Sequence, residues 1–479
     1  MTDLTLRFHS DADIVADQVV LTGLEGREAL GAPYAYELSL EVRADSGWSE
    51  AVITELLTKP AHVTIAHGEL GEHELHGVLR RITLEPMLEP DRALYRATLV
   101  PSLARLELAS GSRIFQDLSG PDVAMKVLAQ HGITFEARLS ETYPAREYIV
   151  QYEESDLAFV RRLLEHWGVT FFFEQLPDGE KMVLVDSASA YLALEGWETV
   201  PYALREAGSR AQAGTIHDLS RTREVRPAKV DLKDWNWRHP QVVPEGEADA
   251  DVEAGEGTVH AYGEHIKDPA EGAWLARVRA EALMADAVRY RGGTDLPALS
   301  PGHKLLLSGY PSGDLDIDYL IVAVEQRFPD AEGGYEKRFE AMPLEVPFRP
   351  RRVTPRPRIS GFMHAVVDGE VHGAAAPIDE HGRYKLLLPF DRLAEPGGRA
   401  SRWVRMSQAS SGPDYGMHLP LHIGCEVALI HVDGDPDRPV ILGAVPNADT
   451  MSPVTQLDAT KSRIRTRSGI LVEMEDAGE

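Results

Sequence analysis

The stretch GCEVALIHVDGDPDRPVILGAVPN, residues Gly424 to Asn447, decides the fold of the C-terminal part of this chain. Apolar residues alternate on both sides of a short polar loop, which predicts two antiparallel strands joined by a turn. We call this loop the acidic hairpin loop; it consists of Asp433, Gly434, Asp435, Pro436, Asp437, Arg438 and Pro439. Asp433 and Gly434 are typical turn residues, and we expect Asp437 and Arg438 to form a local ion pair. The stretch predicts a β-hairpin rather than a catalytic loop.

Alternate aspartates in this loop also resemble the opening of a calcium-binding loop, in which carboxylates converge on a hard cation. The sixth position of that pattern is Arg438 instead of glycine, and the twelfth is Ala444 instead of glutamate. We therefore expect neither a metal nor another cofactor at this loop.

A second candidate for metal binding is the group of His67, His73 and His76 in HGELGEHELHG, with Glu72 or Glu74 as a further ligand. Successive residues of a strand point to opposite faces, so the possible ligands are scattered. We predict a solvated β-hairpin here instead of a metal site.

Length and charge limit the class of protein. A chain of 479 residues is long enough for about three domains. Its net charge of −27 repels phosphate backbones and anionic membranes, which argues against nucleic acid as a partner. The single Cys425 excludes an intramolecular disulfide framework and favours assembly in a reducing cytoplasm. The N-terminus lacks the apolar core of a signal peptide, so export would depend on a dedicated machine.

Alternating strands punctuated by Gly, Pro and Asp predict a mostly antiparallel β unit in the first 110 residues. Helices are expected at residues 121–131, at 156–167 after the N-cap Ser155, and at 269–289 after the N-cap Asp268. Gly292 and Gly293 are expected to close the third helix. Residues 346–358, VPFRPRRVTPRPR, contain four prolines and predict a linker whose arginines are solvated.

The C-terminal segment SRIRTRSGILVEMED, residues 462–476, alternates like a strand but shows no turn that would fold it back on itself. Its apolar residues Ile464, Ile470, Val472 and Met474 have no core of their own to join. We expect them to be buried against other copies of the chain.

Motifs for common enzyme chemistry are missing from the sequence. It contains no phosphate-binding glycine loop, no HExxH and no GxSxG. Adjacent carboxylates such as Glu153 and Glu154 point in different directions and do not suit a glycosidase pair. We therefore predict that the chain is not an enzyme.

Three segments carry a resemblance to a known family. The hairpin described above follows the strand Trp403–Gln408, and it is preceded in the chain by GSRIFQDLSGPDVAMKVLAQHGI (Gly111–Ile133) and REYIVQYEESDLAFVRRLLEHWGVTFFFE (Arg146–Glu174). Together they resemble the VgrG family of spike proteins from type VI secretion and related contractile injection systems. The resemblance implies a mainly β fold with an α+β hub of two barrel-like subdomains, an OB-type β-barrel, and the start of a trimeric β-prism.

The family pattern also implies a domain order. Residues 1–345 would form the phage-hub-like domain with helical insertions, 346–358 the linker, 359–447 the OB-type barrel, and 448–479 a linker and the beginning of the intertwined prism. The prism is long in the family, so we expect a short or truncated needle here.

In function, the resemblance implies a homotrimeric structural spike that adapts a tube to a puncturing tip. Implied partners are a hexameric tube protein, baseplate proteins, and a tip-sharpening protein or effector cargo; the target membrane would be contacted only mechanically. Alternatives are the spike of an extracellular phage-tail-like particle or prophage tail and, from another class, an OB-fold carbohydrate-binding protein. The genes next to this one would distinguish a secretion spike from the spike of an injection particle. Weak retention on oligosaccharide columns would count against the carbohydrate-binding protein.

Overall fold

The computed structural model describes residues 4–14, 18–43, 47–68, 70–86, 90–204, 213–251, 253–328, 335–370 and 375–476. The chain divides into two compact units. Unit 1 comprises Met1–Leu108, Ala124–Tyr143 and Val160–Thr354, and unit 2 comprises Ala109–Val123, Pro144–Phe159 and Pro355–Glu479. Both units consist mainly of β-strands, so the predicted fold class is confirmed.

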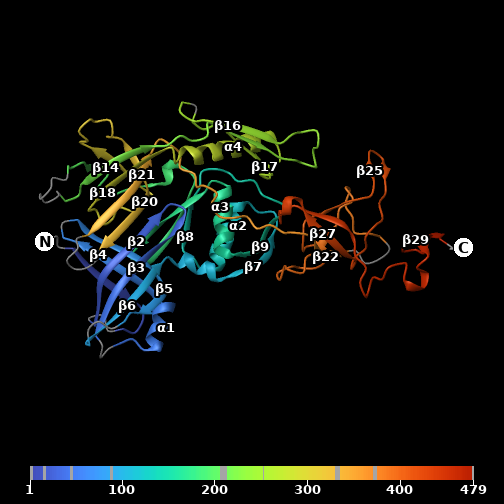
Figure 1. Cartoon of the computed structure of the whole chain (residues 1–479), viewed down its shortest axis with the longest axis horizontal. Coiled ribbons are helices and arrows are strands. Elements are labelled where there is room, and N and C mark those ends of the chain that lie inside the picture. Colours follow the sequence, from blue (N-terminus) through green and yellow to red (C-terminus); the bar gives the residue numbers. More distant parts are fainter. Residues whose placement is uncertain are drawn as a thin grey trace. The chain divides into compact units, whose positions relative to one another are not determined.

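A thirteen-stranded sheet is the largest described element of unit 1. Its strands are β1 (Leu4–Ser10), β2 (Val19–Ala29), β3 (Ala32–Arg43), β4 (Pro60–His67), β5 (Gly71–Leu84), β6 (Arg92–Val100), β12 (Leu192–Ala193), β13 (Thr199–Pro201), β14 (Ile216–Arg223), β18 (Val288–Thr294), β19 (His303–Ser308), β20 (Asp318–Phe328) and β21 (Glu336–Pro343). Ten strands follow in the order β1-β4-β5-β6-β3-β2-β20-β21-β18-β14, while β19 pairs with β20, β12 and β13. The pairing of β2 with β20 therefore joins two halves that are distant in sequence (Figure 1).

Alternation along the strands explains this sheet. In β3, Tyr36, Leu38 and Leu40 are fully buried, and the residues between them face away from the core. β3 pairs antiparallel with β6 in regular register from Tyr36 to Arg43. The antiparallel β unit predicted for the N-terminal segment is confirmed.

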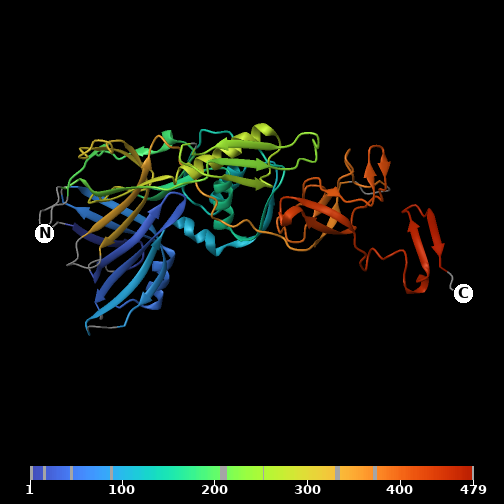
Figure 2. The same cartoon turned by 45° about the horizontal axis from the view of Figure 1, so that its top comes forward.

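Smaller elements complete unit 1. They are α1 (Glu50–Thr58), the 3₁₀ helices at Ser102–Leu108 and Ala188–Ala190, a sheet of β10 (Thr170–Leu176), β11 (Gly179–Val185) and β8 (Phe135–Arg138), and a sheet of β15 (Lys229–Lys233), β16 (Glu245–Asp249) and β17 (Thr258–Tyr262) that packs against α4 (Pro269–Met284). Val230 and Leu232 of β15 share an apolar core with Leu275 and Ala276 of α4. Figure 2 shows the three green strands lying alongside this helix.

The helix starts agree with the sequence. α2 (Gly120–Gln130) and α3 (Asp156–His166) each contribute residues to both units. Ser155 Oγ accepts a hydrogen bond of 3.1 Å from the Ala158 N–H at the start of α3. Asp268 Oδ1 accepts one of 2.9 Å from the Glu271 N–H at the start of α4. These are the N-caps that the sequence predicts.

The predicted end of the third helix is wrong. α4 ends at Met284, and Gly292 and Gly293 lie inside β18. They face Phe339 and Arg338 of β21, and a Cβ on Gly292 would lie 2.8 Å from the Phe339 ring. The two glycines therefore permit a close approach between strands instead of capping a helix.

The hairpin of β4 and β5 is also less exposed than predicted. His67 and His76 are each only 7% exposed, and the His76 N–H donates to Gln175 Oε1 at 2.9 Å. Gln175 belongs to β10, so the strand that contacts β5 removes this part of the hairpin from solvent. The expectation of a solvated hairpin failed because alternation does not reveal what covers the second face of a strand.

Unit 2 contains a five-stranded sheet in the order β23-β22-β27-β28-β24. Its strands are β22 (Met363–Asp368), β23 (Lys385–Leu387), β24 (Arg405–Met406), β27 (Glu426–His431) and β28 (Pro439–Ala444). The remaining elements are the pairs β7 (Ser110–Phe115) with β9 (Ile149–Ser155), β25 (Ser411–Gly412) with β26 (Tyr415–Gly416), and β29 (Lys461–Arg465) with β30 (Leu471–Glu475), and the 3₁₀ helices Val432–Gly434 and Gln456–Asp458. Val427, Leu429 and Ile441 are fully buried in the core of this barrel.

Candidate functional site

The acidic hairpin loop connects β27 to β28 through two consecutive turns. Asp433 (φ 55°) and Gly434 (φ 71°) adopt the left-handed conformation that a tight turn requires. The Asp435 N–H donates to Val432 O at 3.0 Å, and the Arg438 N–H donates to Asp435 O at 2.9 Å. The predicted turn is therefore present, and it directs two of the aspartates inward.

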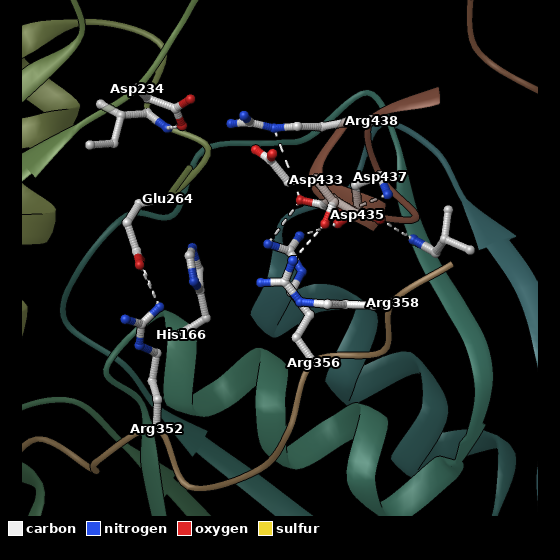
Figure 3. Close-up of polar contacts among 12 residues, drawn as sticks. His166, Asp234, Glu264, Arg352, Arg356, Arg358, Asp433, Asp435, Asp437 and Arg438 are labelled. Carbon is white, nitrogen blue, oxygen red and sulfur yellow. Dashed lines mark hydrogen bonds and ion pairs between the residues drawn. The ribbon is translucent and has the colours of Figure 1, made fainter. Parts of the chain in front are cut away.

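Asp435 and Asp437 are each 8% exposed, and both bind the guanidinium of Arg356. Arg356 Nη1 lies 3.1 Å from Asp435 Oδ2, and Arg356 Nη2 lies 2.8 Å from Asp437 Oδ2 (Figure 3). The calcium-like spacing thus brings two carboxylates together around the cationic head of an arginine. The expected ion pair between Asp437 and Arg438 is wrong, because Asp437 pairs with Arg356 and the ion pair of Arg438 is with Asp435 at 4.0 Å.

The prediction of solvated arginines in the Pro/Arg-rich segment is wrong for Arg349, which is buried. The other four, Arg351, Arg352, Arg356 and Arg358, are exposed but still bind acceptors of the chain. In unit 1, Arg349 is 4% exposed and donates to Glu281 Oε2 at 2.8 Å and to Gly168 O at 3.1 Å. In unit 2, Arg358 donates to the carbonyl of Asp433 at 2.6 Å. Sequence patterns show the proline spacing of such a segment, but they do not show the distant acceptors that fix its arginines.

Arg352, although itself partly exposed, binds a buried carboxylate in unit 1. It donates to both carboxylate oxygens of Glu264 at 2.7 Å, and Arg279 Nη2 lies 3.2 Å from the same group. Burial alone would raise the pKa of Glu264, but the two arginines hold that pKa below its usual value. Figure 3 shows Arg352 pointing toward Glu264.

His431 ends β27 beside the acidic hairpin loop and is 8% exposed. Burial lowers the pKa of its imidazole to about 4, although Asp435 and Asp437 favour the protonated form. Within the described residues its Nδ1 has no hydrogen-bond partner. The ring is therefore neutral at physiological pH and behaves as part of the barrel core.

The C-terminal segment forms a hairpin, which corrects the expectation that it contains no turn. β29 pairs antiparallel with β30, with Ile464 opposite Val472, and Gly469 (φ 93°) closes the turn (Figure 2). The Gly469 N–H donates to Thr466 O at 3.0 Å, so Arg467 and Ser468 are the central residues of the turn, which the sequence analysis did not recognise. Ile464, Ile470, Val472 and Met474 are 46%, 67%, 55% and 63% exposed, and strand alternation gathers them on one face.

The opposite face of this hairpin is occupied by charged side chains. Arg463 Nε donates to Glu473 Oε2 at 2.8 Å, and Arg463 Nη1 donates to Pro453 O at 2.8 Å. Arg463 Nη2 lies 3.3 Å from Asp458 Oδ1, and Lys461 Nζ lies 3.0 Å from Glu473 Oε1. The hairpin is therefore amphipathic, with ion pairs on one face and exposed apolar side chains on the other.

Arg356 was missing from the candidate residues that the sequence suggested, although it binds two of them. A usable signal was present: five arginines stand in the Pro-rich segment of a strongly acidic chain, and an acidic loop follows about 80 residues later. Charge complementarity could have proposed the contact, but the choice among the five arginines depends on the tertiary fold.

Comparison with known proteins places this fold and these segments in a family. Residues 27–331 match the family model of the phage tail baseplate hub, and residues 379–445 match the type VI secretion system/phage-baseplate injector OB domain. The class of protein is thus a baseplate hub joined to an OB-type spike domain.

Curated relatives narrow the class. The type VI secretion system spike protein VgrG1a of Pseudomonas aeruginosa is 32% identical over 480 residues, covering 97% of this chain and 73% of the relative. VgrG1b of the same organism is 32% identical over 96% of this chain, which spans 63% of its length. The chain belongs to the VgrG family of type VI secretion spike proteins.

Other similarities are more distant. A Vibrio cholerae relative named actin cross-linking toxin VgrG1 is 28% identical, and the chain covers 44% of its length. Among solved structures, an Escherichia coli type VI secretion component described as similar to the phage T4 tail proteins gp27 and gp5 superimposes with a TM-score of 0.67 at 24% identity, covering 92% of this chain and 100% of that one. A lidless PdpA-VgrG complex gives a TM-score of 0.60 at 9% identity, covering 99% of this chain and 93% of that one. These structures support the fold.

None of the described helices is both long and apolar enough to cross a membrane.

Proposed function

We propose that this chain acts as a homotrimeric spike and hub of a contractile injection machine of the type VI secretion kind. Its work is mechanical: it adapts the tube to the spike and is driven into a target envelope. It assembles in the cytoplasm and leaves the cell through its own machine, without enzymatic turnover.

The observation that carries this proposal is the amphipathic hairpin of β29 and β30. Its charged face is already satisfied by Arg463 and its partners, whereas its apolar face is exposed. Exposed apolar side chains on both strands of a two-stranded sheet favour burial against further copies. Three such hairpins related by a three-fold axis bury these side chains around the axis.

Partners follow from the same proposal. The match to a baseplate hub model over residues 27–331 supports contact with baseplate proteins and with a hexameric tube protein. The tail end of the spike is the site proposed for a tip-sharpening protein or for effector cargo. A Vibrio cholerae relative is named an actin cross-linking toxin, which is compatible with the proposal that a spike of this kind delivers an effector.

The test is the solution mass of the purified chain, measured by light scattering during dilution. We expect a mass near three times 52.8 kDa that persists on dilution. A double substitution, Ile470→Asp and Val472→Asp, should convert the trimer to monomer, because each buried unpaired charge costs several kcal/mol.

Leu471→Asp is the matched control. Leu471 is 51% exposed and lies between the two substituted residues, but alternation places it on the charged face. The control should remain trimeric. A wild-type chain that is monomeric throughout, or a double variant with unchanged mass, would contradict the proposal.

A further inference from the structure

The paired strands β7 and β9, which we call the ribbon, lie within the sequence range that matches the hub model. In space, however, the ribbon segments belong to unit 2, together with the barrel. The ribbon pairs antiparallel from Ser110 opposite Ser155 to Phe115 opposite Ile149. The boundary between hub and barrel along the sequence therefore differs from the boundary between compact units in space.

Apolar and aromatic side chains of the ribbon contact the barrel. Ile114 packs against the barrel core. The ring of Tyr152 meets that of Phe390 edge to face at 5.7 Å between centroids. The guanidinium of Arg402 lies 5.2 Å from the ring centroid of Tyr148, close to β9.

Asp437 connects the ribbon to the barrel through one buried carboxylate. Its Oδ1 accepts a hydrogen bond of 2.7 Å from the N–H of Val150 in β9. Its Oδ2 accepts one of 2.8 Å from Arg356, and its backbone carbonyl accepts one of 3.0 Å from Arg402. The residue thus joins the ribbon, the segment before the barrel and the barrel strands.

The buried N–H of Val150 requires a strong hydrogen-bond acceptor, and Asp437 supplies it. Val150 is 1% exposed, so its N–H needs an acceptor inside the protein. A carboxylate is a stronger acceptor than a neutral carbonyl, and Arg356 compensates its charge where solvent is excluded. A neutral side chain of the same size would bind both the Val150 N–H and the Arg356 guanidinium less strongly than this carboxylate does.

We infer that Asp437 locks the ribbon to the barrel, so that the two unfold as a single cooperative unit. In the proposed spike, thrust on the hub reaches the barrel through this ribbon as well as through the Pro/Arg-rich segment. That mechanical consequence rests on the proposed function, whereas the lock itself does not.

Hydrogen exchange on the full-length protein tests the inference. In the wild type, we expect the slowest amides of β9 and β27 to exchange through the same opening, with the same dependence on denaturant. Asp437→Ala should accelerate the Val150 amide about 10- to 100-fold, the range for a lost hydrogen bond to a charged group. Asp437→Asn should give a smaller acceleration because the amide oxygen still accepts from Val150.

Asp433→Asn is the matched control, since Asp433 lies exposed in the same loop and asparagine tolerates its left-handed backbone. It should leave the Val150 amide unchanged. The inference is wrong if β9 and β27 open independently in the wild type, or if Asp437→Ala accelerates Val150 no more than the control.

Should Asp437→Ala fail to fold, Arg356→Gln keeps the carboxylate but removes its cation. It must accelerate exchange of the Val150 amide more than Arg358→Gln does, because Arg358 donates to the backbone carbonyl of Asp433 and not to Asp437. Solution mass separates the two hypotheses: loss of the lock leaves the trimer intact, and loss of the trimer leaves the coupled exchange of β9 and β27 intact.

Discussion

Two hairpins of unit 2 both alternate along their strands but lie in opposite environments. The hairpin of β27 and β28 buries Val427, Leu429 and Ile441 completely in its barrel. The hairpin of β29 and β30 leaves Val472 and Met474 more than half exposed. Alternation therefore tells which side chains share a face, and only the surrounding chain determines whether that face is covered.

Their charged residues differ in the same way. In the first hairpin, Asp435 and Asp437 are buried and receive Arg356 from a segment about 80 residues away. In the second, Arg463 binds Glu473 on the neighbouring strand. The ion pairs of the tail hairpin are local, whereas long-range pairs attach the barrel hairpin to its unit.

The largest difference should come from apolar truncation. Leu429→Ala should lower the free energy of unfolding of the barrel by about 2–5 kcal/mol, since it opens a cavity in a closed core. Val472→Ala should leave barrel stability within about 0.5 kcal/mol, because its side chain lies outside that core. Hydrogen exchange of the β27 amides under denaturant measures both, and equal effects would remove the distinction between the hairpins.

Acidification should affect the stability of the barrel hairpin, which contains the buried His431, more than that of the tail hairpin, and this difference should be of intermediate size. The pKa of His431 is lowered to about 4 by burial, so the unfolded chain binds more protons than the folded one between pH 6.5 and 4. The barrel therefore keeps its full stability above pH 6.5. Its free energy of unfolding falls by roughly 3 kcal/mol as the pH falls to 4.

The variant His431→Leu isolates this effect. It should flatten the pH dependence of the opening free energy of β27, obtained from amide exchange after division by the intrinsic rate at each pH, between pH 6.5 and 5, where few carboxylates titrate. An unchanged slope would show that the imidazole does not determine the acid sensitivity of this hairpin.

The smallest difference in stability is expected between alanine substitutions in the turns of the two hairpins. Gly434 and Gly469 both have positive φ, so alanine at either position strains the backbone by about 1 kcal/mol. At Gly434 the new Cβ would also lie 3.1 Å from Ile359 O, while at Gly469 no described atom lies within 4 Å. Thermal unfolding followed in each hairpin by NMR should show that Gly434→Ala is the more destabilising, and the reverse order would contradict this reading of the turns.

Local signals in the sequence predicted much of this fold. The N-caps Ser155 and Asp268 were sufficient because each bonds an N–H three residues away, and the alternation in β3 is a pattern within one strand. The end of α4 could not be predicted in the same way. Gly292 and Gly293 resemble a helix terminator, but their role depends on Phe339 and Arg338 across the sheet.

By itself, the sequence determined the β-rich class, the main helices, the acidic hairpin loop and the resemblance to a spike family. Three features emerge only from contacts in the folded chain: Arg356 binds both buried aspartates, Asp437 accepts from Val150 of the ribbon, and the tail folds back as a hairpin. The physical reason is range: caps, turns and alternation act over a few residues, whereas ion pairs and buried hydrogen bonds select partners by proximity in the folded chain.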